Sequence, residues 1–189
     1  MTASITRRAV LGAGLALSLA SPWAQAQSWP DKPVKLAVGF APGTGPDLLA
    51  RTVGQTFGEL LGQSTVIENR TGAGGQIAAG AIAKSPADGY NLLIADLSAI
   101  SIAPAAFSRL PSDPTKELVP VTEVARTDFV LVVPASMAAK NVQEFVKLAK
   151  EAGGATNFAT FGAGTPGHFG GVVVAGMGGY NSEIVHFRQ

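Results

Sequence analysis

Hydrophobic residues recur with two different periods along the chain, and the two periods alternate. Every second residue is apolar from Val34 to Phe40, which predicts a strand. Residues 64–68 and 90–95 predict two further strands, and residues 76–85 predict a helix. Residues 47–61 predict another helix, and we expect one apolar face of it to be buried: Leu49, Val53, Phe57, Leu60 and Leu61. This order of elements is typical of a parallel sheet covered by helices on both faces.

The second half of the chain resumes the pattern after a proline-rich stretch, residues 104–120. Residues 119–125 and 129–134 predict two strands. Asn141 and Glu144 have capping-box spacing and predict the start of a helix. A strand over 157–161, a helix over 168–177 and a last strand over 183–187 follow. We therefore expect two α/β domains, one over residues 27–125 and a partial second one over residues 126–189.

The first 26 residues have a different character. Arg7 and Arg8 precede twelve uncharged residues, 9–20, and residues 24–26 have the small-x-small form of a cleavage site. This predicts a signal peptide, which is too short to span a bilayer. The paired arginines fit the twin-arginine route, and a general secretory signal that carries two arginines fits equally well. We expect an exported, soluble protein without a lipid anchor, because no cysteine follows the cleavage point.

Composition excludes several kinds of site. The chain is 47% hydrophobic and 14% charged, which favours a packed core, and it has no cysteine for a disulfide, a thiolate nucleophile or a metal site. Its two histidines lie far apart in sequence and no carboxylate cluster accompanies them, so we expect no metal site. Without residues 1–26, 12 basic residues face 13 acidic ones and no basic run occurs. Nucleic acid is therefore not an expected partner.

Two glycine loops share one spacing. Residues 40–47 read FAPGTGPD and residues 161–168 read FGAGTPGH, and each loop lies between a predicted strand and a predicted helix. Each therefore presents free backbone N–H groups at the positive end of a helix dipole. Ligands of open α/β sheets bind at the carboxyl ends of strands, so the two loops could clamp one ligand. Ordinary helix-start turns that are alike by chance are an equally consistent interpretation.

The residues around these loops indicate a small anion. A P-loop needs a lysine after its last glycine, but Pro46 and Asp47 follow Gly45. The dinucleotide fingerprint fails because Leu48 stands at its third glycine position. A carboxylate fits, since backbone N–H groups and a threonine hydroxyl bind it through charge-assisted hydrogen bonds. We expect no cofactor and no catalytic residue, because no G-x-S-x-G elbow occurs and a lone Asp47 or His168 at a helix start favours a cap or a ligand contact.

Residues 66–93 contain the run Glu-Asn-Arg-Thr-Gly-Ala-Gly-Gly. They strongly resemble the signature of the Bug substrate-binding proteins, the TctC-like periplasmic receptors of tripartite tricarboxylate transporters. Residues 29–51, 110–125 and 162–168 are similar to other segments of that family. The resemblance covers nearly all of residues 29–186. It implies a periplasmic-binding-protein type II-like Venus flytrap of two α/β domains, without enzymatic activity.

The resemblance also implies a binding site. In the family a ligand carboxylate is held between the first loop and a second loop of the other domain, with help from the segment that matches residues 96–99. Asp96 departs from the uncharged residues usual there. Carried over residue by residue, the predicted ligand-binding residues are Gly43, Thr44, Gly45, Asp47, Ser98, Gly164, Thr165, Gly167 and His168. We interpret Glu68, Asn69 and Arg70 as structural residues that tie the adjoining glycine loop.

The implied function is a periplasmic receptor that captures a small carboxylate-bearing metabolite and delivers it to the membrane components of a tripartite tricarboxylate transporter. One alternative is a sensing module that acts on a partner protein. Another is a small exported hydrolase that uses His168 and a loop hydroxyl. Family members continue past the segment resembled by residues 182–187. We therefore expect a C-terminally truncated chain with an incomplete second domain that is marginally stable, prone to self-association and a poor binder of its ligand even if its first domain folds.

Overall fold

The computed structural model describes residues 28–187, and the predicted signal peptide lies outside them. The first sheet has three strands in the order β2-β1-β3, with β1 (Val34–Val38) between β2 (Thr65–Asn69) and β3 (Asn91–Ile94). Both pairings are parallel, and Val38 stands opposite Asn69 on one side and Ile94 on the other. The three predicted strands and their parallel arrangement are confirmed. The carboxyl ends of all three strands therefore lie along one edge.

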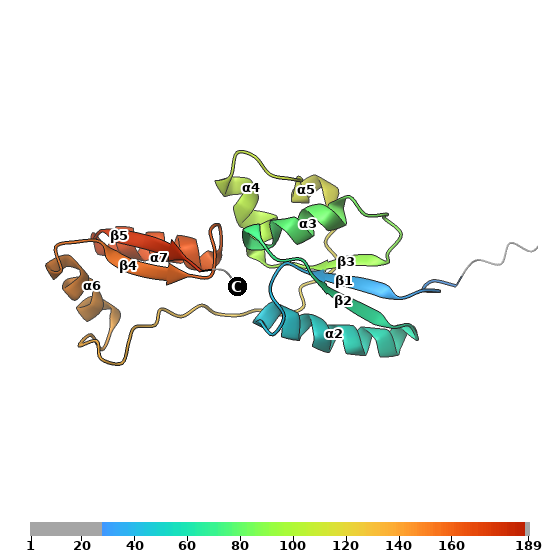
Figure 1. Cartoon of the computed structure of the whole chain (residues 1–189), viewed down its shortest axis with the longest axis horizontal. Coiled ribbons are helices and arrows are strands. Elements are labelled where there is room, and N and C mark those ends of the chain that lie inside the picture. Colours follow the sequence, from blue (N-terminus) through green and yellow to red (C-terminus); the bar gives the residue numbers. More distant parts are fainter. Residues whose placement is uncertain (1–27, 188–189) are drawn as a thin grey trace, which may run out of the picture. The chain divides into compact units, whose positions relative to one another are not determined.

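Helices α2 (Gly45–Leu61) and α3 (Gln76–Ala83) cover opposite faces of this sheet, as Figure 1 shows. The predicted apolar face of α2 is confirmed in part, because Leu49, Val53, Phe57 and Leu61 are half-buried and Leu60 is 79% exposed. The fully buried apolar positions of the helix are instead Ala50 and Gly54. A Cβ on Gly54 would lie only 3.1 Å from Ile67 Cδ1. Small residues thus let the helix backbone approach the sheet closely, and the larger apolar side chains lie beside the contact rather than in it.

Short helical turns close the carboxyl edge of the first sheet. The 3₁₀ turn η1 (Ala73–Gly75) precedes α3, and the π-helical turn η2 (Ser98–Ile102) follows β3 and continues into α4 (Ala103–Ala106); α5 (Pro114–Glu117) comes next. Gly39, just past β1, packs against η1, since a Cβ on Gly39 would lie 2.5 Å from Gly75 Cα. This approach needs glycine at position 39, and it brings the loop after β1 against the segment that opens α3.

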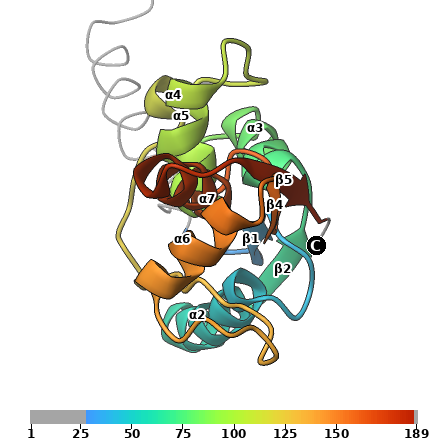
Figure 2. The ribbon, with the colours of Figure 1, turned by 90° about the vertical axis from the view of Figure 1, so that its left-hand side faces the viewer.

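The second sheet pairs β4 (Thr156–Thr160) and β5 (Ser182–His186) in parallel, from Thr156 opposite Ser182 to Thr160 opposite His186. Helix α7 (Pro166–Gly178) connects the two strands and packs on both of them (Figure 2). Helix α6 (Val142–Glu151) precedes β4. Asn141 is its N-cap as predicted, because the Glu144 N–H donates to Asn141 Oδ1 at 2.9 Å. The Glu144 carboxylate accepts from the N–H of Lys140, one residue before the cap, at 2.7 Å, in place of the cap N–H of a standard capping box.

The strands predicted over residues 119–125 and 129–134 are wrong. Among the described residues, no strand pairs with either segment, and the chain between α5 and α6 runs as a connection without regular structure (Figure 1). Val119, Val130 and Val132 are 78–88% exposed. A strand pattern in sequence becomes a strand only where a neighbour completes its hydrogen-bond ladder, and none does so here. The domain boundary predicted at residues 125 and 126 stays a prediction.

Candidate functional site

The first glycine loop connects β1 to α2 through a glycine in the left-handed region, Gly43, with φ of 83°. Thr44 is the N-cap of α2, with extended backbone angles, and its hydroxyl donates to the Ala41 carbonyl at 2.7 Å. Gly45 and Pro46 form the first helical positions. The Thr44 side chain therefore closes the loop, and its hydroxyl proton is already used in a hydrogen bond within the loop.

Asp47 holds this loop from within the helix and is only 1% exposed. Its Oδ2 accepts from the Gly43 N–H at 2.8 Å and from Arg51 Nε at 2.9 Å. Its Oδ1 accepts from Arg51 Nη2 at 3.1 Å and from Asn69 Nδ2 at 2.9 Å. The bonds from Arg51, Gly43 and Asn69 lower the pKa of the Asp47 carboxyl to about 2. The interpretation of Asp47 as the N-cap is wrong, since Thr44 occupies that position and Asp47 lies three residues further on.

The second glycine loop connects β4 to α7 with the same construction. Gly164 has φ of 78°, and Thr165 is the N-cap of α7. The Thr165 hydroxyl donates to the Gly162 carbonyl at 2.6 Å and accepts from the His168 N–H at 3.4 Å. His168 Nδ1 accepts from the Gly164 N–H at 3.1 Å, as the Asp47 carboxylate does from Gly43. His168 is therefore not the N-cap either; it stands three residues beyond it.

The shared spacing of the two loops thus corresponds to shared geometry. In each loop the glycine is left-handed, the threonine caps the helix and bonds to the carbonyl three residues before it, and the third helical residue binds the glycine N–H. The electrostatics differ. Asp47 is an anion paired with Arg51, whereas burial and the nearby His186 lower the pKa of His168 and favour its neutral form.

The loops leave specific backbone donors without a partner in their helices. The first N–H groups of an α-helix have no intrahelical acceptor. Proline removes one of these donors in each helix, at Pro46 and Pro166. The donors that remain at the start of α2 are the N–H groups of Gly45 and Asp47. At the start of α7 the donor is the N–H of Gly167, because Thr165 already accepts the His168 N–H.

The predicted residue Ser98 lies in a separate turn at the end of β3. It is 1% exposed, its hydroxyl donates to Asp96 Oδ2 at 2.9 Å, and its N–H donates to Asp96 Oδ1 at 3.0 Å. Burial raises the pKa of the Asp96 carboxyl. Because β1 and β3 are parallel neighbours, this turn and the first loop share the carboxyl edge of the first sheet. Asp96 thus shapes the turn that holds Ser98.

The structural interpretation of residues 68–70 is confirmed for the pairing of Glu68 with Arg70, but the loop that Asn69 ties is the first glycine loop and not the adjoining one. Glu68 pairs with Arg70 at 2.9 Å and with Lys35 at 3.1 Å. Asn69 Nδ2 donates to the Phe40 carbonyl at 2.9 Å and so ties β2 to the first loop. Arg51 was missed by the sequence analysis. Its position four residues after Asp47 on a helix is the signal that could have found it.

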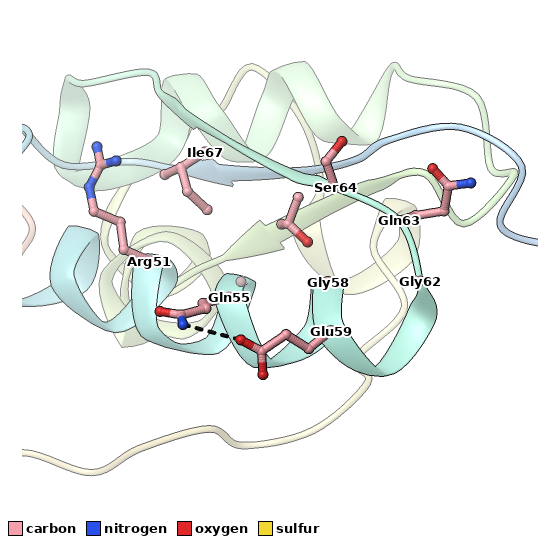
Figure 3. A pocket seen from close by; sticks show the side chains of 10 residues that line it. Arg51, Gln55, Gly58, Glu59, Gly62, Gln63, Ser64 and Ile67 are labelled. Atoms are coloured by element: carbon pink, nitrogen blue, oxygen red, sulfur yellow. Dashed lines mark hydrogen bonds between the residues drawn. The ribbon is translucent and has the colours of Figure 1, made fainter.

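An open groove of about 570 Å³ lies between α2 and β2, and Figure 3 shows the side chains that line it. Arg51 lies at one end of it, and Gln55 donates to Glu59 along its rim at 3.1 Å. None of the predicted ligand-binding residues lines this groove. Within residues 28–187 no group of three or more metal-ligating side chains lies together, and no helix there is long and apolar enough to cross a membrane.

Residues 49–188 match the family model described as the tripartite tricarboxylate transporter family receptor, TctC. That match spans more than half of the chain. The chain belongs to this family. It is similar to a UPF0065 protein of Bordetella bronchiseptica, with 41% identity over 76% of this chain and 43% of the relative. The protein BugT of Bordetella pertussis is 33% identical over 85% of this chain and 49% of its own length.

Solved structures share the fold of this chain. A structure described as a periplasmic transporter matches with a TM-score of 0.79 and 35% identity over 85% of this chain and 54% of that one. Two Rhodopseudomonas palustris proteins at 27% identity, MatC with bound malate and a second protein with adipate, match with TM-scores of 0.72 and 0.71 over 84% and 85% of this chain and 54% of each of theirs. The periplasmic-binding-protein fold predicted from the sequence is confirmed. The chain spans about half the length of the proteins it matches.

Proposed function

We propose that this chain is the ligand-binding part of a periplasmic receptor that captures a small carboxylate for a tripartite tricarboxylate transporter. The observation that carries the proposal is the glycine loop that occurs twice with the same geometry. A motif built twice, with first-turn N–H groups left unpaired by the helix, is suited to the oxygens of an anion. Family membership and the malate and adipate of the two R. palustris proteins support the same class of ligand.

The proposed contacts are backbone donors rather than the threonine hydroxyls. Thr44 and Thr165 both donate their hydroxyl protons to carbonyls of their own loops, and Asp47 uses both carboxylate oxygens inside the protein. We assign direct contact to the N–H groups of Gly45, Asp47 and Gly167. Gly43, Thr44, Gly164, Thr165 and His168 keep their loops in shape, and Ser98 shapes the adjoining turn.

This assignment needs no catalytic step. A hydrolase would require a nucleophile activated by a base. Here His168 Nδ1 already accepts an amide proton, and the two threonine hydroxyls point their protons at carbonyls. The proposed partners are a small carboxylate and the membrane components of the transporter, and the proposed location is the periplasm.

Titration calorimetry with adipate, malate and the uncharged diamide adipamide tests the proposal. Adipate and adipamide have the same carbon chain, so the comparison isolates the charge that the loop donors recognise. We expect adipate or malate to bind and adipamide to give no heat. Equal binding of adipate and adipamide, or turnover of an ester of either acid, would contradict the proposal.

A further inference from the structure

Helix α7 starts with a contact that depends on protonation. The contact joins the Gly164 N–H to His168 Nδ1 at 3.1 Å, and we call it the His168 latch. It spans the left-handed residue Gly164 and the N-cap Thr165. An imidazole nitrogen accepts a hydrogen bond only while it carries no proton. The latch therefore exists only with neutral His168, and the proton of that neutral ring is on Nε2.

We infer that His168 is the positioning residue of the second loop, which it holds closed as the Nε2–H tautomer and releases when it gains a second proton. The first loop supports this role, because Asp47 binds the Gly43 N–H from the equivalent helix position at 2.8 Å. The identification of a carboxylate as the ligand of this loop rests on the proposed function. The hydrogen bond between Gly164 and His168 does not depend on it.

The surroundings of His168 favour the neutral ring. Strand β4 has no titratable residue, and β5 has Glu183 and His186, of which His186 meets the His168 ring edge-on with centroids 4.7 Å apart. Helix α6 meets the far end of α7, where Gly179 lies near Lys150. Burial first, and His186 second, lower the pKa of His168, and a cation at the start of a helix opposes the dipole as well.

The two loops therefore respond differently to acid. The His168 latch is closed at neutral pH and opens as the pH falls through the lowered pKa of His168. The Asp47 carboxylate remains an acceptor until the pH approaches its own pKa of about 2. Between these limits the second loop loses its hold on Gly164 while the first loop keeps its hold on Gly43.

Nuclear magnetic resonance on the ligand-free chain tests the latch directly. At pH 8 the imidazole ¹⁵N shifts should report the Nε2–H tautomer for His168. The Gly164 amide resonance should move with the same midpoint as the His168 ring, and the Gly43 amide should not. In His168→Asn the pH-dependent movement of the Gly164 amide resonance should vanish, because the asparagine side-chain oxygen accepts a hydrogen bond at any pH. An Nδ1–H tautomer, or a Gly164 amide that ignores the titration of His168, would overturn the inference.

Affinity at pH 8 tests the positioning role, since His168 is neutral there and no charge changes. Asp47 shows that a side chain of asparagine length reaches the glycine N–H from this helix position. We expect His168→Asn to bind adipate or malate within about twofold of the parent chain and His168→Leu to bind about three- to tenfold more weakly, the effect of one lost hydrogen bond. Equal losses in the two variants, or no loss in either, would overturn the positioning role. If the parent chain binds neither acid, the carboxylate proposal fails. The tautomer of His168 and the titration of the Gly164 amide then still show whether the His168 latch exists.

Discussion

Gly45 offers the sharpest test of a backbone donor, because two substitutions there differ in the N–H group. A Cβ on Gly45 meets nothing within 4 Å, and the residue is the first of α2. Alanine keeps the N–H, whereas proline removes it and is well tolerated at the first helical position. Thr44, the preceding residue, already has the extended angles that a following proline favours, with φ of −78° and ψ of 165°.

If the Gly45 N–H binds a ligand carboxylate, Gly45→Pro removes one hydrogen bond to a charged group. Such a bond contributes about 1.5–3 kcal/mol. This corresponds to a dissociation constant roughly 10- to 150-fold higher. Gly45→Ala should bind within about twofold of the parent chain, since it keeps the donor in open space.

Titration calorimetry with adipate and malate at pH 7.5 gives the affinities, and thermal melting of both variants controls for folding. We expect Gly45→Ala to melt within a few degrees of the parent chain, because a Cβ there meets nothing within 4 Å. Gly45→Pro removes no intrahelical bond, but it places one proline before another, Pro46, and its melting temperature measures the cost of that restriction. Equal affinity of Gly45→Pro and Gly45→Ala would refute the assignment of this N–H to the ligand. A loss of affinity in Gly45→Ala but not in Gly45→Pro would show that a Cβ at this position disturbs the ligand, and would refute the inference that it points into open space.

Three further outcomes can be measured. Thr165→Val should lower the free energy of unfolding in urea by about 1 kcal/mol, because it removes the N-cap of α7, and Thr165→Ser should restore it; a stable valine variant would contradict the capping role. The Asp47 carboxyl has a folded pKa of about 2, so its contribution to the stability of the folded chain is present above the unfolded pKa and is lost as the pH falls from about 4 towards 2. Melting temperatures over pH 2–5 should show this loss in the parent chain and less of it in Asp47→Asn. Parallel curves for the two chains would refute the prediction. The exposed valines of residues 119–133 should cause concentration-dependent self-association in size-exclusion chromatography, and Val130→Thr with Val132→Thr should reduce it; a parent chain that is monodisperse at every concentration would show that this surface does not associate.

Local patterns in the sequence determined most of the regular elements. The alternation over Val34–Val38 sufficed for β1, and Asn141 with Glu144 sufficed for the start of α6. The common spacing of residues 40–47 and 161–168 predicted two loops of one kind. These features depend on residues a few positions apart, so the sequence carries them directly.

Contacts between distant residues were decided only by the tertiary structure. Asp47 accepts a hydrogen bond from Asn69, 22 residues away in sequence. This contact, together with those from Gly43 and Arg51, makes Asp47 a buried carboxylate with bonds to both oxygens, where the sequence predicted a helix cap. Gly54 allows the backbone of α2 to lie close to the sheet. A glycine has no apolar side chain, so the hydrophobic pattern of the sequence does not reveal this contact. Residues 119–134 have the composition of strands but form none, because a strand requires a partner elsewhere in the fold. The sequence therefore determines where the chain prefers to bend, coil or extend, and packing decides which of these preferences are realised.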